Sequence, residues 1–406
     1  MSEKLSLRDL ELQGKKVLMR VDFNVPLDKQ GNITDDTRIK AALPSIHYIL
    51  EHGASLILMS HLGRPKASPD TQFSLAPCAK RLSELLNLPV KMAPDCIGND
   101  TENLARHLKP GQILLLENLR FHPGEEKPLE DPTFAKKLAN LGDIYVNDAF
   151  GTAHRAHAST AEITRYFPEK AAAGFLLENE IKFLGDSLLR PTRPFYAIIG
   201  GAKISTKIGV LKSLFKKVDG ILIGGGMAYT FFKAQGIDIG NSIHEDALLD
   251  QAREILKLAA ESPHIKFMLP IDQVIANSLD DKAEMRTIDT QTNIPSNFQG
   301  VDIGPKTIQQ YTSTLRDAKT IFWNGPLGVF EISIFAKGTN AIAHALAAST
   351  ATTIIGGGES VAAIEAAGTS DKITHISTGG GATLEYIEFG TLPGIEALSD
   401  RVRIKQ

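Results

Sequence analysis

Four arginines and one histidine occur in polar segments that follow short apolar runs in the first half of the chain. They are Arg38, His61, Arg64, Arg120 and Arg155. The planar guanidinium group of arginine matches phosphate and carboxylate oxygens in a bidentate manner. One such arginine alone is usually a solvated surface residue. Five basic residues in the same context predict a site for a small anion with several charges.

Two polar residues follow the first apolar run, in the segment RVDFNVP. Asp22 and Asn24 there are the residue types that satisfy their own backbone in turns. Their functional interpretation is that they orient substrate hydroxyl or carboxyl groups, which cationic side chains alone would not do.

Glycine clusters take the corresponding positions in the second half, in IIGGAKISTK, ILIGGGMA, WNGPLGVFE, IIGGGES and STGGGATLE. Glycine allows a phosphate to approach the backbone closely, and free N–H groups at a helix N-terminus attract it. We therefore expect a nucleotide to bind where these glycine clusters follow the apolar runs. The two common nucleotide fingerprints are absent, because Tyr229, Val361 and Leu384 stand where a GxGxxG motif needs its last glycine, and no GxxxxGK[ST] occurs.

Charged residues accompany these glycines. Lys203 and Lys207 lie four apart, and we expect them on one face of a helix that aims both amines at phosphate oxygens. The alternative interpretation is that these two lysines only form an ordinary exposed basic face of that helix. Glu359 follows Gly356–Gly358, where it either favours the helix dipole or helps to place a magnesium ion that is bound mainly by nucleotide phosphates and water.

Runs rich in valine, isoleucine and leucine alternate with longer amphipathic segments, which predicts βαβ units around parallel sheets. The expected strands are Lys16–Val21, Ser55–Ser60, Gln112–Leu116, Asp143–Asn147, Phe195–Ile199, Gly220–Ile223, Thr320–Trp323, Thr352–Ile355 and Thr374–Ser377. Leucines and an isoleucine recur at helical spacing between the halves. The predicted fold is α/β, with two Rossmann-like, doubly wound parallel-sheet domains (residues 1–174 and 190–390) joined by a hinge helix (residues 175–189).

Composition restricts the function further. A chain of 406 residues with 43% apolar content exceeds the size at which one core stops growing. A net charge of -3 argues against a nucleic-acid or anionic-membrane partner. Two cysteines give no disulfide framework, so we expect a reducing compartment, the cytoplasm. The N-terminus lacks the apolar core of a secretory signal.

The whole chain resembles the phosphoglycerate kinase family. The resemblance rests on RVDFNVP, SHLGRPK, LENLRF, NDAFGTAHRAHAS, GGAKISTKIGV, GGGMAYTFF, DIGPKT, WNGPLGVFE and STGGGATLE, in this order. One departure is visible, because the family commonly has Asp-Thr after a glycine run where this chain has Glu359 and Ser360.

This resemblance implies magnesium-dependent, reversible phosphoryl transfer from 1,3-bisphosphoglycerate to ADP by a monomer. The residues expected at 3-phosphoglycerate are Asp22, Phe23, Asn24, Arg38, His61, Leu62, Gly63, Arg64, Arg120 and Arg155. Those expected at ATP or ADP are Lys203, Lys207, Gly224, Gly225, Gly226, Asn324, Glu331, Gly357, Gly358, Glu359 and Ser360, with Glu359 beside Mg²⁺. Arg38 and Lys203 are the predicted catalytic residues, and the C-terminal residues 391–406 are expected to pack on the first domain.

Phosphoryl transfer needs both ligands together and water excluded, so the resemblance also implies domain closure about the hinge helix. Two other classes of function stay open from the sequence. A nicotinamide-dependent dehydrogenase is disfavoured because no GxGxxG follows a first strand. A non-catalytic nucleotide-binding regulator would not need the second, arginine-lined site.

Overall fold

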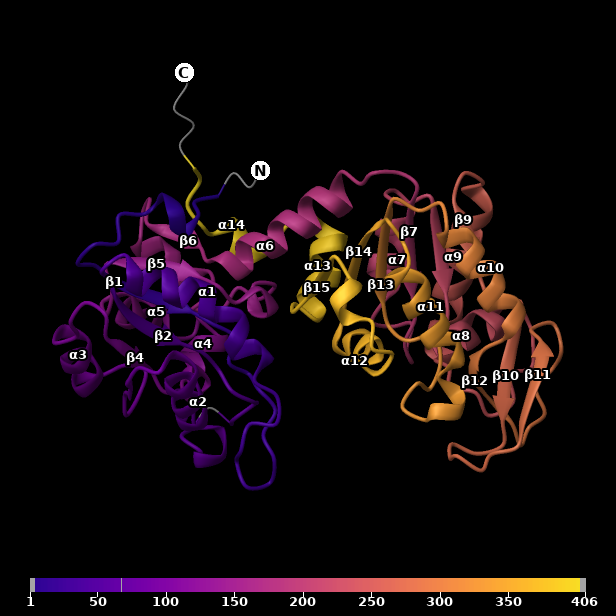
Figure 1. Ribbon diagram of the computed structural model, residues 1–406, viewed down its shortest axis with the longest axis horizontal. Coiled ribbons are helices and arrows are strands. Elements are labelled where there is room, and N and C mark those ends of the chain that lie inside the picture. The colour runs from indigo at the N-terminus through magenta and orange to yellow at the C-terminus, as the bar shows by residue number, and fades with distance from the viewer. Residues whose placement is uncertain (1–3, 67, 402–406) are drawn as a thin grey trace, which may run out of the picture. The chain divides into compact units, whose positions relative to one another are not determined.

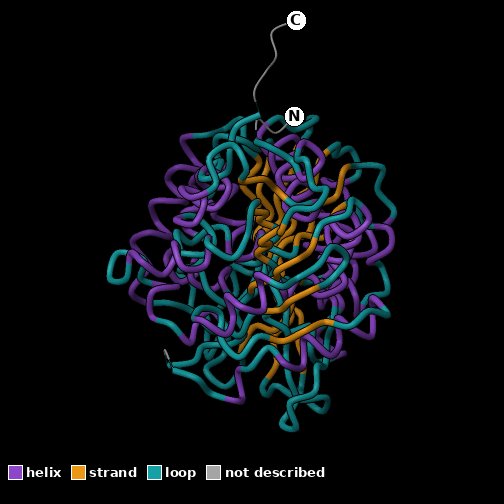
Figure 2. Tube along the Cα trace, turned by 90° about the vertical axis from the view of Figure 1, so that its left-hand side faces the viewer, coloured by secondary structure: helices purple, strands orange, loops and turns teal. Residues whose placement is uncertain are grey.

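The computed structural model describes residues 4–66 and 68–401, and the chain divides into two compact units. Unit 1 comprises Met1–Lys182 together with Thr391–Gln406, and unit 2 comprises Phe183–Gly390. Each unit contains a six-stranded parallel sheet with helices on both faces (Figures 1 and 2). The predicted fold class is confirmed.

The sheet of unit 1 has the strand order β3-β4-β2-β1-β5-β6. Its strands are β1 (Lys16–Arg20), β2 (Ser55–Met59), β3 (Val90–Met92), β4 (Ile113–Leu115), β5 (Ile144–Asn147) and β6 (Ala171–Ala173). The helices are α1 (Thr37–Glu51), α2 (Ala76–Leu86), α3 (Asn99–Arg106), α4 (Pro123–Glu126), α5 (Pro132–Ala139), α6 (Phe175–Leu184) and α14 (Pro393–Glu396). Every residue of β2 is buried, as expected of a strand that is covered on both faces.

The large sheet of unit 2 has the order β9-β8-β7-β13-β14-β15, which is the strand order typical of dinucleotide-binding folds. Its strands are β7 (Phe195–Ile199), β8 (Gly220–Ile223), β9 (Lys266–Met268), β13 (Thr320–Asn324), β14 (Thr352–Gly356) and β15 (His375–Ser377). The helices are α7 (Ile208–Leu214), α8 (Met227–Ala234), α9 (Leu249–Glu261), α10 (Pro305–Leu315), α11 (Lys337–Ala347), α12 (Gly358–Ala366) and α13 (Gly381–Phe389).

A second sheet in unit 2 is antiparallel, with the order β11-β10-β12. It consists of β10 (Asp272–Ala276), β11 (Met285–Asp289) and β12 (Gln299–Ile303). The sequence prediction missed this sheet. Short 3₁₀ helices lie in the loops: η1 (Leu7–Asp9), η2 (Thr71–Phe73), η3 (Leu119–Phe121), η4 (Phe150–Thr152), η5 (Glu162–Tyr166), η7 (Asp246–Leu248), η8 (Ser333–Phe335) and η9 (Ser370–Lys372).

The predicted connecting helix forms as α6 and continues as a single π-helical segment, η6 (Gly185–Leu189). The boundary between the two units falls after Lys182, inside this helix. Leu177, Ile181 and Leu184 are buried, which explains why apolar residues recur there at helical spacing.

The C-terminal segment belongs to unit 1 by its contacts. The backbone N–H of Leu5 donates to Ser399 O at 2.8 Å, and Lys4 pairs with Asp400. Residues 402–406 of the predicted tail lie outside the described residues. Over the ranges 4–66 and 68–401, no helix combines the length and apolar character needed to cross a membrane.

Candidate active site

Each large sheet has one place where neighbouring strands continue into connections on opposite sides, and ligands in open α/β sheets bind at the carboxyl ends of such strands. In unit 1 this switch point lies between β1 and β5, and in unit 2 between β7 and β13. The predicted site residues follow these strands and their neighbours.

Asp22 and Arg38 contact each other at the carboxyl end of β1. Arg38 lies in the first turn of α1 and donates a hydrogen bond from Nη1 to Asp22 Oδ2. Its side chain is partly exposed while that of Asp22 is mostly covered. The carboxylate therefore holds the guanidinium group at the sheet edge and leaves other N–H groups for an anion.

His61 is buried and contacts a second arginine, Arg20, at the end of β1. Arg20 Nη2 lies 3.1 Å from His61 Nδ1. Burial, reinforced by the surrounding arginines, holds the pKa of His61 well below its ordinary value, so the ring is neutral. A guanidinium group only donates, so Nδ1 accepts and the proton lies on Nε2. His61 thus offers a hydrogen-bond donor, not a positive charge, to an anion.

Gly63 connects two other predicted residues, Asn24 and Arg120, through its backbone. Its N–H donates to Asn24 Oδ1 at 2.8 Å, and its carbonyl accepts from Arg120 Nη1 at 2.7 Å. The φ angle of Gly63 is +61°, and a Cβ atom there would collide with the ring of Phe73. Glycine is therefore required here to bring the loop after β2 against Asn24 and Arg120.

Glu126 links Arg120 to another predicted arginine, Arg155. Its Oε1 lies 3.0 Å from Arg120 Nε and 4.0 Å from Arg155 Nη1. Arg64 is exposed, and no ion pair connects it to another residue in 4–66 or 68–401. The last two predicted positions, Phe23 and Leu62, are buried and shape the site without offering a charge.

The sequence analysis missed Arg20, which is 1% exposed. Arg20 Nε donates to Ser159 Oγ at 2.9 Å, and that hydroxyl donates to Glu125 Oε1 at 2.6 Å. These buried hydrogen bonds fix the position of Arg20, which in turn contacts His61. An arginine that ends an apolar strand, as in VLMRV, was the available signal, because such a residue needs a buried partner.

In unit 2, glycine-rich loops after β7, β8 and β13 lie backbone against backbone. Gly225 has a φ angle of +68°, and a Cβ atom there would lie 2.6 Å from Pro326 O and 2.7 Å from Gly201 N. No other residue type fits this contact. The predicted run Gly224–Gly226 therefore brings three strand exits together at the switch point.

The predicted helix face of Lys203 and Lys207 is wrong. Helix α7 begins at Ile208, and Lys207 is its N-cap residue with a φ angle of -122°. The preceding residues form a turn, because buried Ile204 accepts from Lys207 N while Ser205 N donates to Glu245 at 2.9 Å. Lys203 is exposed in this loop.

Lys207, Asn324 and Gly356 form one hydrogen-bonded group, and Gly357 packs against it. Lys207 Nζ donates to Asn324 Oδ1, and Asn324 Nδ2 donates to Gly356 O at 2.6 Å. Gly357 has a φ angle of +94°, and a Cβ atom there would lie 2.8 Å from Asn324 Nδ2. Burial lowers the pKa of Lys207 to about 8, although Glu359 favours its charged form.

The first residues of α12 place the last two predicted residues, Glu359 and Ser360, next to the glycine loops. Ser360 is buried, and its Oγ accepts from Gly325 N at 2.5 Å. Glu359 is exposed in the first turn of α12, and its Oε2 lies 3.8 Å from the point that a Cβ atom on Gly201 would occupy. A carboxylate here is able to share a cation with phosphate oxygens.

A cavity of about 330 Å³ opens beside these loops, within unit 2. At one end it is lined by Gly201, Gly226 and Glu359, and elsewhere by the apolar side chains of Phe232, Ile243, Leu279, Val301 and Leu327. Glu331 also lines it. The volume and the apolar lining with few polar groups are typical of small-molecule sites. The sequence analysis did not single out these apolar residues: Phe232 and Leu327 lie within GGGMAYTFF and WNGPLGVFE, whereas Ile243, Leu279 and Val301 lie outside every motif that it used.

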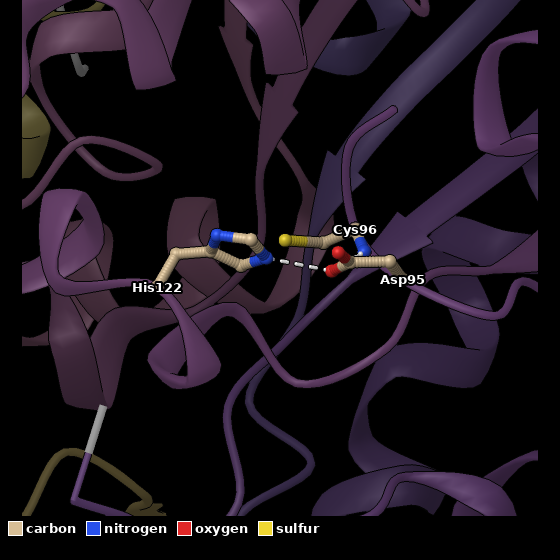
Figure 3. A group of neighbouring side chains, drawn as sticks. All are labelled: Asp95, Cys96 and His122. Atoms are coloured by element: carbon tan, nitrogen blue, oxygen red, sulfur yellow. Dashed lines mark hydrogen bonds and ion pairs between the residues drawn. The ribbon is translucent and has the colours of Figure 1, made fainter. Parts of the chain in front are cut away.

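Among residues 4–66 and 68–401, one group of side chains is close enough to hold a metal ion: Asp95, Cys96 and His122 (Figure 3). Asp95 Oδ1 accepts from His122 Nε2 at 2.7 Å and from Cys96 N at 2.6 Å. Burial raises the pKa of the Cys96 thiol well above its ordinary value. These contacts connect the loop after β3 to the loop after η3. This structural role explains why the three side chains lie close together, and no metal ion is needed to explain it.

The fold and site define a class of α/β protein in which separate parallel-sheet units present a cationic edge and a glycine-rich edge. The family model for phosphoglycerate kinase matches residues 7–389. A phosphoglycerate kinase from Chlorobium limicola is 57% identical over 401 residues, which cover 98% of this chain and 100% of that protein. Another from Koribacter versatilis is 54% identical over 405 residues, with the same coverage.

Solved structures agree. The structure of phosphoglycerate kinase from Coxiella burnetii matches with a TM-score of 0.86 at 42% identity, over 97% of this chain and 98% of that one. The enzyme from Pyrococcus horikoshii matches with a TM-score of 0.83 at 35% identity, over the same shares. The chain belongs to the phosphoglycerate kinase family.

Proposed function

We propose that this chain transfers the acyl phosphate of 1,3-bisphosphoglycerate reversibly to ADP, giving 3-phosphoglycerate and ATP in glycolysis and gluconeogenesis. It is a phosphotransferase with a carboxyl group as acceptor. The observation that carries the proposal is the family match over residues 7–389, in a chain that keeps both ligand edges. A coupled assay with 3-phosphoglycerate and ATP tests it. The proposed function would be refuted if the protein showed no turnover in this direction or in the reverse one.

We assign 3-phosphoglycerate to unit 1. Arg38, Arg64 and Arg155 retain exposed surface there, while buried Arg120 shapes the loop at Gly63. Guanidinium groups bind phosphate and carboxylate oxygens, and the neutral His61 adds an N–H donor. Asp22 and Asn24 orient the hydroxyl and carboxyl groups, as the sequence predicts.

We assign the nucleotide to unit 2. The phosphates lie at the glycine loops and at Lys203 and Lys207, where free N–H groups and amines favour negative charge. The cavity of about 330 Å³ takes the base and ribose, with Glu331 at the ribose hydroxyls. Its apolar lining suits the faces of a purine.

Arg38 and Lys203 are the proposed catalytic residues. Phosphoryl transfer requires in-line placement of donor and acceptor oxygens and positive charge on the migrating group. Both side chains retain exposed surface, so they are free to reach that group. The acceptor is an ionised ADP oxygen or a carboxylate, so the reaction needs no general base and no nucleophilic side chain.

Magnesium is the proposed cofactor. The fit rests on Glu359, an exposed carboxylate that lines the cavity at the start of α12. Mg²⁺ is commonly held by one or two carboxylates together with substrate phosphates and water. When bound, the ion neutralises charge on the nucleotide phosphates. Glu359 would hold the ion together with the nucleotide phosphates, at the position where the family commonly has the shorter aspartate.

We further propose that the two units close about α6 and its flanking loops when both substrates are bound, because phosphate has to pass between ligands held on different units. Small-angle scattering tests this closure. The two cysteines are free thiols, which suits a reducing compartment such as the cytoplasm. We expect the enzyme to act as a monomer, without a nucleic-acid or membrane partner.

A further inference from the structure

Asn118 is a fully buried amide between two loops of unit 1. It lies directly before η3 and is 0% exposed. Its Nδ2 donates to the carbonyl oxygens of Leu62 and Phe73, both at 2.8 Å. Its Oδ1 accepts from Arg120 N at 3.1 Å. An amide nitrogen has two N–H groups, so both are used, and each binds a backbone carbonyl.

The two carbonyls belong to the ends of the chain segment that carries Arg64. The backbone just before Arg64 is held from two further sides at Gly63. The N–H of Gly63 donates to Asn24 Oδ1 at 2.8 Å, and its carbonyl accepts from Arg120 Nη1 at 2.7 Å. Among these side chains, only Asn118 binds both ends of the segment.

Arg64 differs from the other predicted arginines in how its side chain is held. Carboxylates approach the guanidinium groups of Arg38, Arg120 and Arg155. Arg64 is exposed and forms no ion pair within the described ranges 4–66 and 68–401. An arginine side chain has many rotamers, so without a carboxylate partner its direction depends on where its backbone lies.

We propose that Asn118 is a positioning residue of the 3-phosphoglycerate site, which fixes the backbone at Leu62 and Phe73 and thereby directs the guanidinium group of Arg64 to the bound anion. The inference rests on the proposed function of unit 1. Because Asn118 is fully buried, it acts through Arg64 and does not touch the substrate. A guanidinium group binds phosphate or carboxylate oxygens well only when its N–H groups face them, so a displaced backbone lowers the affinity.

The test replaces the amide by a carboxyl group of the same shape. Asn118→Asp keeps an acceptor for Arg120 N and, as a carboxylate, offers no N–H to the two carbonyls. We expect the dissociation constant for 3-phosphoglycerate, measured by titration calorimetry, to rise about tenfold or more, the scale of one hydrogen bond to a charged group. KM for 3-phosphoglycerate should rise with it. KM for ATP should not change, because the nucleotide is assigned to unit 2.

A double-mutant cycle with Arg64→Ala separates positioning from a general loss of structure. If Asn118 acts by placing Arg64, Asn118→Asp should weaken binding much less once the guanidinium group has been removed. A purely structural role would weaken binding by the same factor in both backgrounds. Asn118→Ala has no side-chain donor in any protonation state, and it provides the same comparison if Asn118→Asp does not fold.

Thr101→Val is the matched control for the loss of a buried donor. Thr101 lies in α3, is 1% exposed, and donates from Oγ1 to Asp95 O at 2.8 Å, which is again a backbone carbonyl of unit 1. Its dissociation constant for 3-phosphoglycerate should equal that of the unmodified protein. An unchanged dissociation constant in folded Asn118 variants, or equal factors in the two Arg64 backgrounds, would overturn the inference. Absence of 3-phosphoglycerate binding by the unmodified protein would instead refute the proposed function.

Discussion

Arg38 is the proposed catalytic residue of unit 1. It is partly exposed and donates to Asp22. We expect Arg38→Ala to lower kcat by about 10³-fold or more, because an arginine on the migrating phosphoryl group contributes on that scale. The fold should survive, since exposed ion pairs contribute about 0 to 1 kcal/mol. Steady-state kinetics and urea unfolding measure the two effects.

Arg253→Ala is the control for this variant. Arg253 also pairs with a carboxylate, that of Asp250, but it lies on α9 away from both proposed ligand edges. Its kcat should stay near the unmodified value. A near-normal kcat in Arg38→Ala would remove Arg38 from the proposed mechanism.

The lowered pKa of Lys207 leads us to expect that the proposed nucleotide site binds ADP in a pH-dependent way. Burial lowers the pKa of its amine to about 8. Below that pH the amine is charged and attracts phosphate, and as the pH rises through 8 the charge is lost. We therefore expect the dissociation constant for ADP to increase by about tenfold between pH 7 and pH 9.5. Equilibrium titration calorimetry across this range measures it.

Lys207→Arg separates this amine from other titrating groups. A guanidinium group keeps its charge throughout the range. The variant should bind ADP with a flatter pH profile, even if arginine fits the contact with Asn324 less well and binds more weakly overall. Parallel profiles for the two proteins would show that Lys207 is not the titrating group.

At the scale of elements, strands were predicted correctly where the sequence has a run of residues with high β propensity. Phe195–Ile199 and Gly220–Ile223 were predicted with the bounds that β7 and β8 have. Gln112–Leu116 was predicted one residue too long at both ends, and each other predicted strand differs by one residue at one end. Ala171–Ala173 was missed, because alanine has little β propensity and pairing with β5 decides its conformation. The exposed strand β11 was missed because its residues show no buried face.

The candidate site shows the same limit. Residues within motifs, such as Asn24 and Gly63, were predicted and do contact each other. Gln273 and Leu279 were missed, because they reach the cavity through an antiparallel sheet that no motif announces. The helix predicted to carry Lys203 and Lys207 was wrong, because burial of Ile204 and the turn around it outweigh the spacing of the lysines.

Helix α6 begins on a buried carboxyl group, and this sets an element-scale prediction. Asp148 Oδ1 accepts from Leu176 N at 2.9 Å and from Leu177 N at 3.2 Å. Burial raises the pKa of Asp148 to about 6, although the hydrogen bonds to Ser45 and to these backbone groups lower it. Its contribution to stability is therefore complete below about pH 4 and is lost as the pH rises through 6.

Asp148→Asn removes this titration while an amide oxygen still accepts the helix N–H groups. A pKa raised by about two units corresponds to roughly 3 kcal/mol. We expect the unmodified protein to lose that much more free energy of unfolding between pH 4 and pH 7 than the variant does. Urea unfolding by far-UV circular dichroism measures the difference. Asp143→Asn, at an exposed carboxyl group, controls for loss of any acid, and equal pH slopes in all three proteins would contradict the prediction.

The whole molecule carries a separate natural reporter in each unit. Trp323 is the single tryptophan of the chain, and it is fully buried in unit 2. Both cysteines, Cys78 and Cys96, are buried free thiols in unit 1. Tryptophan fluorescence therefore follows the unfolding of unit 2, and reaction of the thiols with a chromogenic disulfide follows the exposure of unit 1.

These reporters test the assignment of one ligand to each unit. A ligand that binds only the folded form stabilises it by about 2.7 kcal/mol at a hundredfold excess over its dissociation constant. We expect ADP to raise the urea midpoint of the Trp323 signal more than that of thiol exposure, and 3-phosphoglycerate to slow thiol reaction while moving the Trp323 signal less. Sulfate at matched ionic strength controls for unspecific anion effects. If each ligand shifted both reporters equally, or if the pattern were reversed, the assignment of the nucleotide to unit 2 and of 3-phosphoglycerate to unit 1 would be wrong.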